Sequence, residues 1–186
     1  TEFPPFQQAI RYGVASLMTA HVLYRALDPE APATLSSAVI QRLLREEFRY
    51  EGVVFTDDLE MHAIIAHDGI GEAAVRSFVA GCDVLLICKD QDRVMTAMQA
   101  MERAVKDGRV TQERLDQSLA RVAKLKARYL HPYKPVTISD ARLVVGCRSH
   151  KVLLDSWHKA YARIPKPTLV ERGQAAPAHD SPVTHV

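Results

Sequence analysis

Three apolar stretches alternate along the chain with stretches in which apolar residues recur at helical spacing. The apolar stretches cover 14–20, 53–56 and 83–88, and a glycine lies shortly before each of them. Apolar residues dominate them and do not alternate regularly with polar ones. This pattern is typical of strands buried on both faces, as in a parallel sheet.

Helices are predicted between and after these strands. Apolar residues recur at helical spacing over 39–48, with Ser36 as a candidate N-cap, and again over 94–105 and 115–129. A further helix over about 73–80 is expected to end at Gly81, because glycine is typical of helix C-termini. Strands alternating with helices over short links predict an α/β fold of about three β/α units.

Three strands cannot close a barrel. We therefore expect this chain to be part of a larger domain, or to self-associate through an exposed sheet edge.

The pattern weakens after about residue 131. A short strand is predicted over 138–145 and an amphipathic helix over 151–161, which carries Trp157. From 164 onward, prolines stand among small polar residues, which predicts a disordered tail. We divide the chain into residues 1–130, an extension over 131–163 and a tail over 164–186.

Composition narrows the function classes only a little. The 186 residues are 47% hydrophobic and 25% charged, which is enough for one domain with a real core. A net charge of +2 gives no electrostatic case for nucleic acid or an anionic membrane as a partner. No apolar run approaches the roughly 20 residues of a membrane span. The chain begins with Thr1, so the lack of a recognisable signal peptide decides nothing about secretion.

The three cysteines, Cys82, Cys88 and Cys147, are an odd and scattered set. Free thiols are expected here, and neither a disulfide framework nor a metal site. No cofactor is expected.

The most informative feature is the acidic pair Asp57 and Asp58, which directly follows the apolar run 53–56. Burying an unpaired charge costs several kcal/mol, so carboxylates at a strand end usually lie at its mouth. In α/β proteins the carboxyl ends of parallel strands are where ligands bind. The alternative for Asp58 is a helix N-cap, since a helix-like stretch follows it.

Several segments together resemble bacterial β-N-acetylglucosaminidases of glycoside hydrolase family 3. They include Leu-Met-Thr-Ala-His-Val at 17–22 and Gly-Val-Val-Phe-Thr-Asp-Asp-Leu-Glu-Met at 52–61. The others lie at 26–29, 32–36, 43–48, 80–86 and 111–130. The resemblance covers roughly residues 3 to 130, and its specificity comes from several motifs occurring in the correct order.

The resemblance implies that the chain is the C-terminal part, about three β/α units, of a TIM-like barrel. It also implies that Asp57 is the catalytic nucleophile of a retaining glycosidase, forming a covalent glycosyl-enzyme that water then opens. His21, Asp58 and Met61 are the expected substrate-binding residues. The expected substrate is an N-acetylglucosaminide, such as a muropeptide fragment, and the expected location is the bacterial cytoplasm.

The chain also departs from the family pattern. Relatives carry a Lys-His-Phe-Pro-Gly-His-Gly segment followed by an Asp-x-His dyad that serves as general acid/base, and neither motif occurs here. His62 and His67 follow the acidic pair but do not match the dyad. Because proton transfer contributes about 10²–10⁴-fold to such reactions, we expect an incomplete enzyme that is inactive by itself.

Two other function classes remain open. One is a non-catalytic half-barrel that serves as an interaction module. The other is a receiver-like, magnesium-dependent phosphate-binding domain, in which the acidic pair and Lys89 would hold the ion and the phosphoryl group. That fold needs about five parallel strands, and the pattern predicts three.

Overall fold

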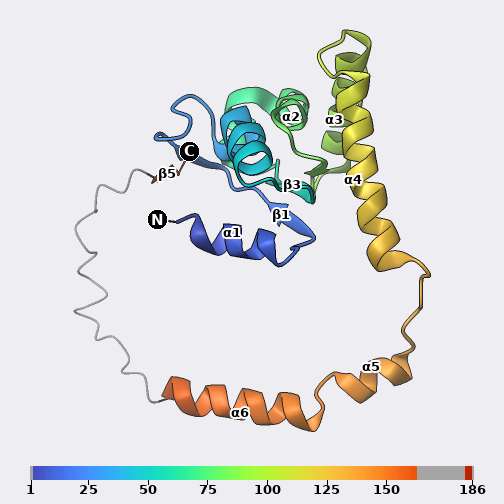
Figure 1. Cartoon of the computed structure of the whole chain (residues 1–186). Helices are drawn as coiled ribbons and strands as arrows, with labels where there is room; N and C mark the ends of the chain where they lie inside the picture. The colour runs from blue at the N-terminus through green and yellow to red at the C-terminus, as the bar shows by residue number, and fades with distance from the viewer. Residues whose placement is uncertain (1, 163–182, 186) are drawn as a thin grey trace. The chain divides into compact units, whose positions relative to one another are not determined.

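The computed structural model of the chain describes residues 2–162 and 183–185 (Figure 1). It divides into two units, one of residues 1–129 with 182–186 and one of residues 130–181. The first unit holds the sheet and the acidic pair.

A parallel sheet of three strands forms the centre of the first unit. Strand β1 (Ser16–Met18) pairs with β3 (Val53–Asp58), and β3 pairs with β4 (Val84–Leu86), in the order β1-β3-β4. This confirms the three predicted strands and the α/β class, although β1 and β4 are shorter than predicted. A second, antiparallel pair joins β2 (Val22–Tyr24) to β5 (Val183–His185), and neither strand was predicted.

Helices surround this sheet, as the periodicity predicts. In chain order they are α1 (Pro4–Arg11), the 3₁₀ turn η1 (Ala33–Leu35), the π-helical segment η2 (Ala38–Glu47), α2 (His62–Ala80), α3 (Gln91–Lys106) and α4 (Gln112–Leu130). Helix α2 begins well before the predicted residue 73, and its two halves meet at a kink at Gly69. It ends at Gly81, as predicted, where a φ of 123° favours a residue without Cβ.

The start of η2 confirms the expected cap. The Ser36 hydroxyl accepts a hydrogen bond from the Val39 backbone N–H at 3.2 Å, and it donates to Asp28 Oδ2 at 2.6 Å. The apolar face of η2 buries Ile40 and Leu43, so the predicted periodicity corresponds to the observed core.

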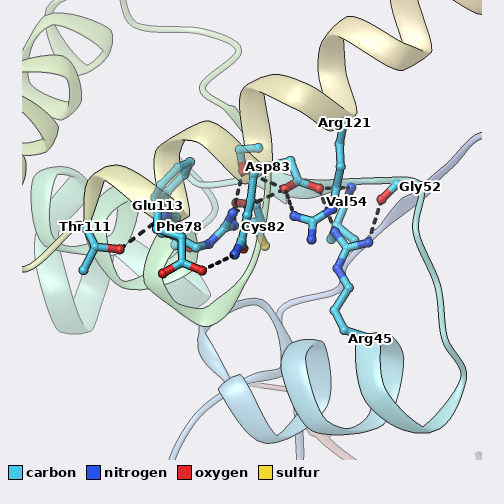
Figure 2. Close-up of polar contacts among 12 residues, drawn as sticks. Arg45, Gly52, Val54, Phe78, Cys82, Asp83, Thr111, Glu113 and Arg121 are labelled. Atoms are coloured by element: carbon cyan, nitrogen blue, oxygen red, sulfur yellow. Dashed lines mark hydrogen bonds and ion pairs between the residues drawn. The ribbon is translucent and has the colours of Figure 1, made fainter.

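Asp83, just before β4, joins helix α4 to the sheet (Figure 2). Its side chain is fully buried. Oδ1 accepts from Ser118 at 2.6 Å and from Arg121 at 3.0 Å, while Oδ2 accepts from Arg45 at 2.7 Å and from the Val54 N–H at 3.0 Å. One carboxylate thus connects η2, β3 and α4.

The described part of the second unit, up to residue 162, contains the helices α5 (Ile138–Val144) and α6 (Arg148–Ala162). Helix α6 confirms the predicted helix over 151–161, but the predicted strand over 138–145 is wrong. The Thr137 hydroxyl accepts from the Asp140 N–H, and the Asp140 carboxylate accepts from the Thr137 N–H. This capping box starts a helix and outweighs the β-branched residues in the segment.

The predicted disordered tail over 164–186 lies outside the described residues, except for the backbone of β5. Within the described part of the chain, no helix is both long and apolar enough to cross a bilayer.

Candidate active site at the carboxyl ends of the strands

The carboxyl ends of the three parallel strands meet at one edge of the sheet. Thr19 follows β1, Asp57 and Asp58 end β3, and Cys88 lies two residues after β4. The sheet therefore brings together polar groups from distant parts of the sequence, as expected for a ligand-binding edge.

Strand β3 contains one extra residue relative to β4. Phe55 pairs with Val84 and Asp58 pairs with Leu86, so the register shifts between them. In the shifted stretch the buried Thr56 side chain replaces a backbone acceptor, because its hydroxyl accepts from the Leu86 N–H at 2.9 Å. Such a bulge changes the direction of the side chains that follow, and bulges often lie next to active sites.

Asp57 is partly exposed at this bulge. Its Oδ1 accepts from the Asp58 N–H at 2.8 Å, and its own N–H donates to the Thr19 hydroxyl at 3.4 Å. Its Oδ2 makes no hydrogen bond to any residue that the structure describes. One carboxylate oxygen of Asp57 is therefore available to a ligand.

Asp58 is held differently. Its Oδ1 accepts from the Glu60 N–H at 3.1 Å and from the Cys88 N–H at 3.4 Å. The alternative of a helix N-cap is wrong, because α2 begins at His62 with Met61 in the cap position. Asp58 instead connects the loop after β3 to the loop after β4.

His21 is buried, and both ring nitrogens are engaged. Nε2 lies 2.9 Å from the Asp58 carbonyl oxygen, and Nδ1 lies 2.8 Å from the Thr34 hydroxyl. Because a carbonyl only accepts, Nε2 carries the proton; in the neutral ring Nδ1 then accepts from Thr34. Thr34 in turn accepts from the Thr19 hydroxyl at 2.8 Å, and Thr19 accepts from the Asp57 N–H.

These bonds form one relay through His21, Thr34 and Thr19, which begins and ends on the backbone of the acidic pair. Each hydroxyl donates once and accepts once, so all groups are satisfied. The prediction that His21 binds substrate stays a prediction, and the geometry shows it fixing the strand end.

Glu60 organises the neighbouring loop. Its Oε2 accepts from the backbone N–H groups of Lys89 at 2.5 Å and Asp90 at 3.2 Å, and its Oε1 lies 3.5 Å from Arg93. Met61 is 46% exposed beside it, which leaves an apolar side chain free at the mouth. Its role in substrate binding also stays a prediction.

Sequence reasoning did not single out Thr19, Thr34 or Glu60 as site residues. Thr19 lies at a strand end, which is a usable signal. Thr34 carries no local signal, since it meets His21 only through the fold. No group of three or more His, Cys, Asp or Glu side chains with metal-ligand geometry occurs among the described residues.

Comparison with known proteins identifies related sequences and structures. The family described as Glycosyl hydrolase family 3 N terminal domain matches residues 1–125. A beta-hexosaminidase from Nitrosomonas eutropha is 36% identical over 127 residues, which are 67% of this chain and 36% of that protein. The structure of a glycoside hydrolase family 3 beta-N-acetylglucosaminidase from Paenibacillus shares 46% identity with a TM-score of 0.69, over 72% of this chain and 26% of that one. The beta-N-acetylglucosaminidase of Thermotoga maritima shares 29% identity with a TM-score of 0.62, over 66% of this chain and 27% of that one.

The chain thus spans between a quarter and a half of the length of these relatives. The parallel sheet and its helices correspond to part of the TIM-barrel-like domain of these neighbours, which confirms the expected fold class.

Proposed function

The chain belongs to the glycosyl hydrolase family 3 N-terminal domain family, and on this basis we propose that it supplies the catalytic nucleophile, Asp57, of a retaining β-N-acetylglucosaminidase. The relatives named beta-hexosaminidase support a glycosidase. The observation that carries the assignment to Asp57 is that its carboxylate, at the carboxyl edge of the sheet, accepts a single hydrogen bond from the described residues, whereas that of Asp58 accepts two from separate loops. This family membership also argues against the receiver-like, magnesium-dependent alternative.

The proposed reaction has two steps. In the first, an Asp57 carboxylate oxygen bonds to the anomeric carbon while the glycosidic C–O bond breaks and the leaving oxygen takes a proton from a general acid. In the second, water attacks the anomeric carbon, gives its proton to the same residue acting as base, and releases Asp57.

The contacts of the two carboxylates support Asp57 over Asp58. Asp58 accepts from two backbone N–H groups, of Glu60 and Cys88, and so holds loops together. Asp57 accepts only from the N–H of the next residue, which orients the group without occupying its second oxygen. The second oxygen of Asp58 is also unpaired among the described residues, so the contrast rests on the two loop contacts that hold Asp58.

The relay through His21 holds the backbone on either side of the acidic pair and so helps to position Asp57. It holds the Asp57 N–H and the Asp58 carbonyl, so the peptide unit before Asp57 and the one after Asp58 are both fixed. We assign His21, Thr34 and Thr19 a positioning role, because none of these contacts reaches the free oxygen of Asp57.

The 186 residues contain neither the Lys-His-Phe-Pro-Gly-His-Gly segment nor an Asp-x-His sequence. We propose that the general acid/base and most sugar contacts come from residues outside this sequence, and that these 186 residues alone do not hydrolyse glycosides. The expected substrate remains an N-acetylglucosaminide such as a muropeptide fragment, and the proposed location remains the bacterial cytoplasm.

The test uses a nitrophenyl N-acetyl-β-glucosaminide, whose good leaving group needs little acid assistance. We expect negligible turnover by these 186 residues, and turnover after co-expression with the remaining barrel of a family relative. Asp57→Ala should abolish the restored activity, and a fluorosugar that traps the glycosyl-enzyme should add its mass to a peptide containing Asp57.

Trapping that survives Asp57→Asn but disappears in Asp58→Asn would overturn the assignment. Turnover by the bare chain would mean that it contains its own acid/base. A complemented barrel that binds the sugar but never hydrolyses it would favour the non-catalytic interaction module.

A further inference from the structure

A cavity lies at the opposite end of the sheet from Asp57. It has a volume of about 290 Å³ and lies among Val14, which precedes β1, the first residues of β3, and the last turns of α4. Since Asp57 follows the carboxyl end of β3, this cavity is separate from the candidate active site.

The charged residues in its wall are mostly cationic. Arg49, Arg121, Lys124 and Arg128 line the cavity, against one carboxylate, Glu51. Glu51 and Lys124 lie 3.8 Å apart, but both are strongly exposed, so this pair contributes little neutralisation. Neither Arg49 nor Arg128 forms an ion pair with any carboxylate that the structure describes.

The neighbouring carboxylate Asp83 cannot neutralise the cationic residues that line the cavity. Asp83 faces three guanidinium groups, those of Arg45 at 2.7 Å, Arg121 at 3.0 Å and Arg114 at 3.6 Å (Figure 2). It also accepts from the Ser118 hydroxyl at 2.6 Å, so both oxygens are occupied. One negative charge therefore serves three positive ones.

The surroundings of Arg45 and Arg114 are consistent with an excess of positive charge around Asp83. Arg45 Nε is buried and has no hydrogen-bond partner among the described residues. Burial is the main cause that lowers the pKa of Arg45 and of Arg114, and the positive charge of Arg121 lowers both further. Arginine keeps its charge at neutral pH all the same, so the repulsion persists in the folded chain.

An oxyanion in the cavity would place negative charge beside Arg121, which pairs with Asp83 and also lines the cavity. Guanidinium groups bind phosphate oxygens through paired N–H donors, and the charge-assisted bonds are the strong ones. The wall also contains the apolar side chains of Val14 and Leu125 and the ring of Tyr129, which would suit a small organic body. The volume is at the lower limit for small-molecule pockets, which excludes large ligands.

We propose that this cavity binds a small phosphate-bearing anion, held by Arg49, Arg121 and Arg128 at the amino-terminal end of the sheet. Both inorganic phosphate and a monosaccharide phosphate present the required group. Binding is independent of glycosidase activity, because none of these residues reaches the edge that carries Asp57.

Calorimetric titration of the 186-residue chain tests the proposal, with inorganic phosphate and glucose 6-phosphate as separate probes at constant ionic strength. We expect saturable binding of at least one probe. Tighter binding of the sugar phosphate would show that the apolar wall contributes, and equal binding would assign the site to the phosphate group alone. Arg49→Gln combined with Arg128→Gln should weaken binding at least tenfold, because both residues are proposed to contact the phosphate. Neither residue contacts Asp83, so the double variant should fold, and circular dichroism can verify this.

Lys126→Gln is the matched control, because this residue lies on the same helix and does not line the cavity. It should leave affinity within twofold, and Glu51→Gln should tighten binding. The proposal is wrong if neither phosphate binds the folded chain more tightly than chloride does, or if the double variant binds as well as the wild type.

Discussion

His21 donates from Nε2 to the backbone carbonyl of Asp58 at 2.9 Å, across 37 residues of sequence. This bond joins the segment after β1 to the end of β3, so the geometry of the acidic pair depends on a residue outside its own strand. The bond also fixes the tautomer of the ring.

For the neutral ring, the relay predicts the tautomer with the proton on Nε2 and an unprotonated Nδ1. Nitrogen-detected NMR of the imidazole should show this tautomer in the folded chain. Thr34→Val removes the donor to Nδ1 and should lower the free energy of unfolding by about 1–3 kcal/mol, the usual cost of leaving a buried polar group unsatisfied. Thr34→Ser keeps the hydroxyl and should retain the tautomer. A protonated Nδ1 in the wild type would contradict the relay.

Asp83→Asn should be among the most destabilising single substitutions in the first unit. It leaves three guanidinium groups without their shared carboxylate, and breaking a buried ion pair costs about 3–5 kcal/mol. Urea unfolding followed by circular dichroism measures the loss. Asp116→Asn is the control on α4, where an exposed carboxylate accepts only from Gln112, and we expect a change within about 0.5 kcal/mol. Equal effects of the two substitutions would refute the role of Asp83.

Substituting two glycines with positive φ, Gly81 and Gly108, should distinguish the cost of backbone strain from the cost of steric crowding. A Cβ on Gly81 would lie 2.8 Å from Ile40 Cγ2, whereas a Cβ on Gly108 would meet nothing within 4 Å. Gly81→Ala therefore adds overpacking to backbone strain and should cost about 2–4 kcal/mol, while Gly108→Ala should cost about 1 kcal/mol. Thermal and urea unfolding of both variants give the comparison, and a larger loss for Gly108 would contradict it.

The three thiols should react in a fixed order. A hydrogen bond with the Ser149 hydroxyl lowers the pKa of Cys147, while desolvation, followed by the charges of Asp58 and Glu60, raises the pKa of Cys88. Burial raises the pKa of Cys82 to about 12. Only the thiolate is nucleophilic, so a lower pKa gives more reactive thiol at any pH below it. Alkylation near pH 8, followed by peptide mass analysis, should modify Cys147 first, then Cys88, and Cys82 only on unfolding.

The edge of β1 that faces away from β3 should promote self-association. Met18 is 60% exposed on this strand, and exposed edges pair readily with other chains. Sedimentation velocity over a range of concentrations should show association of the wild type that Met18→Lys reduces. A monomer at every concentration would count against this prediction.

The sequence contained enough information to predict the three sheet strands, because their apolar runs are continuous and bounded by glycine or charge. The sequence also predicted the position of Asp57 at the carboxyl edge of the sheet, because burying an unpaired carboxylate after an apolar strand would cost several kcal/mol. The wrong prediction over 138–145 has a local cause. Ile138 and the valines at 144 and 145 favour a strand, but the Thr137–Asp140 capping box starts a helix there.

Other parts of the site depend on tertiary contacts that no local pattern reveals. Thr34 becomes a site residue only because the fold places it against His21. The bulge in β3 depends on the Thr56 hydroxyl replacing a backbone acceptor for Leu86, and a threonine in a strand gives no sign of such a role. Strands of three residues, such as β2, are too short for periodicity to detect.

The extra residue in β3 has a consequence for how length changes in the chain would be tolerated. Deleting Thr56 would remove the extra residue from β3, so Phe55 would still pair with Val84 and Asp58 with Leu86, and Asp57 would lie opposite Leu85. Asp57 would then lose the bulge that now sets the direction of its side chain, and its side chain would point to the opposite face of the sheet from those of Phe55 and Asp58. The direction of the proposed nucleophile therefore depends on the number of residues in β3 as well as on their chemistry, because one residue of β3 has no partner in β4.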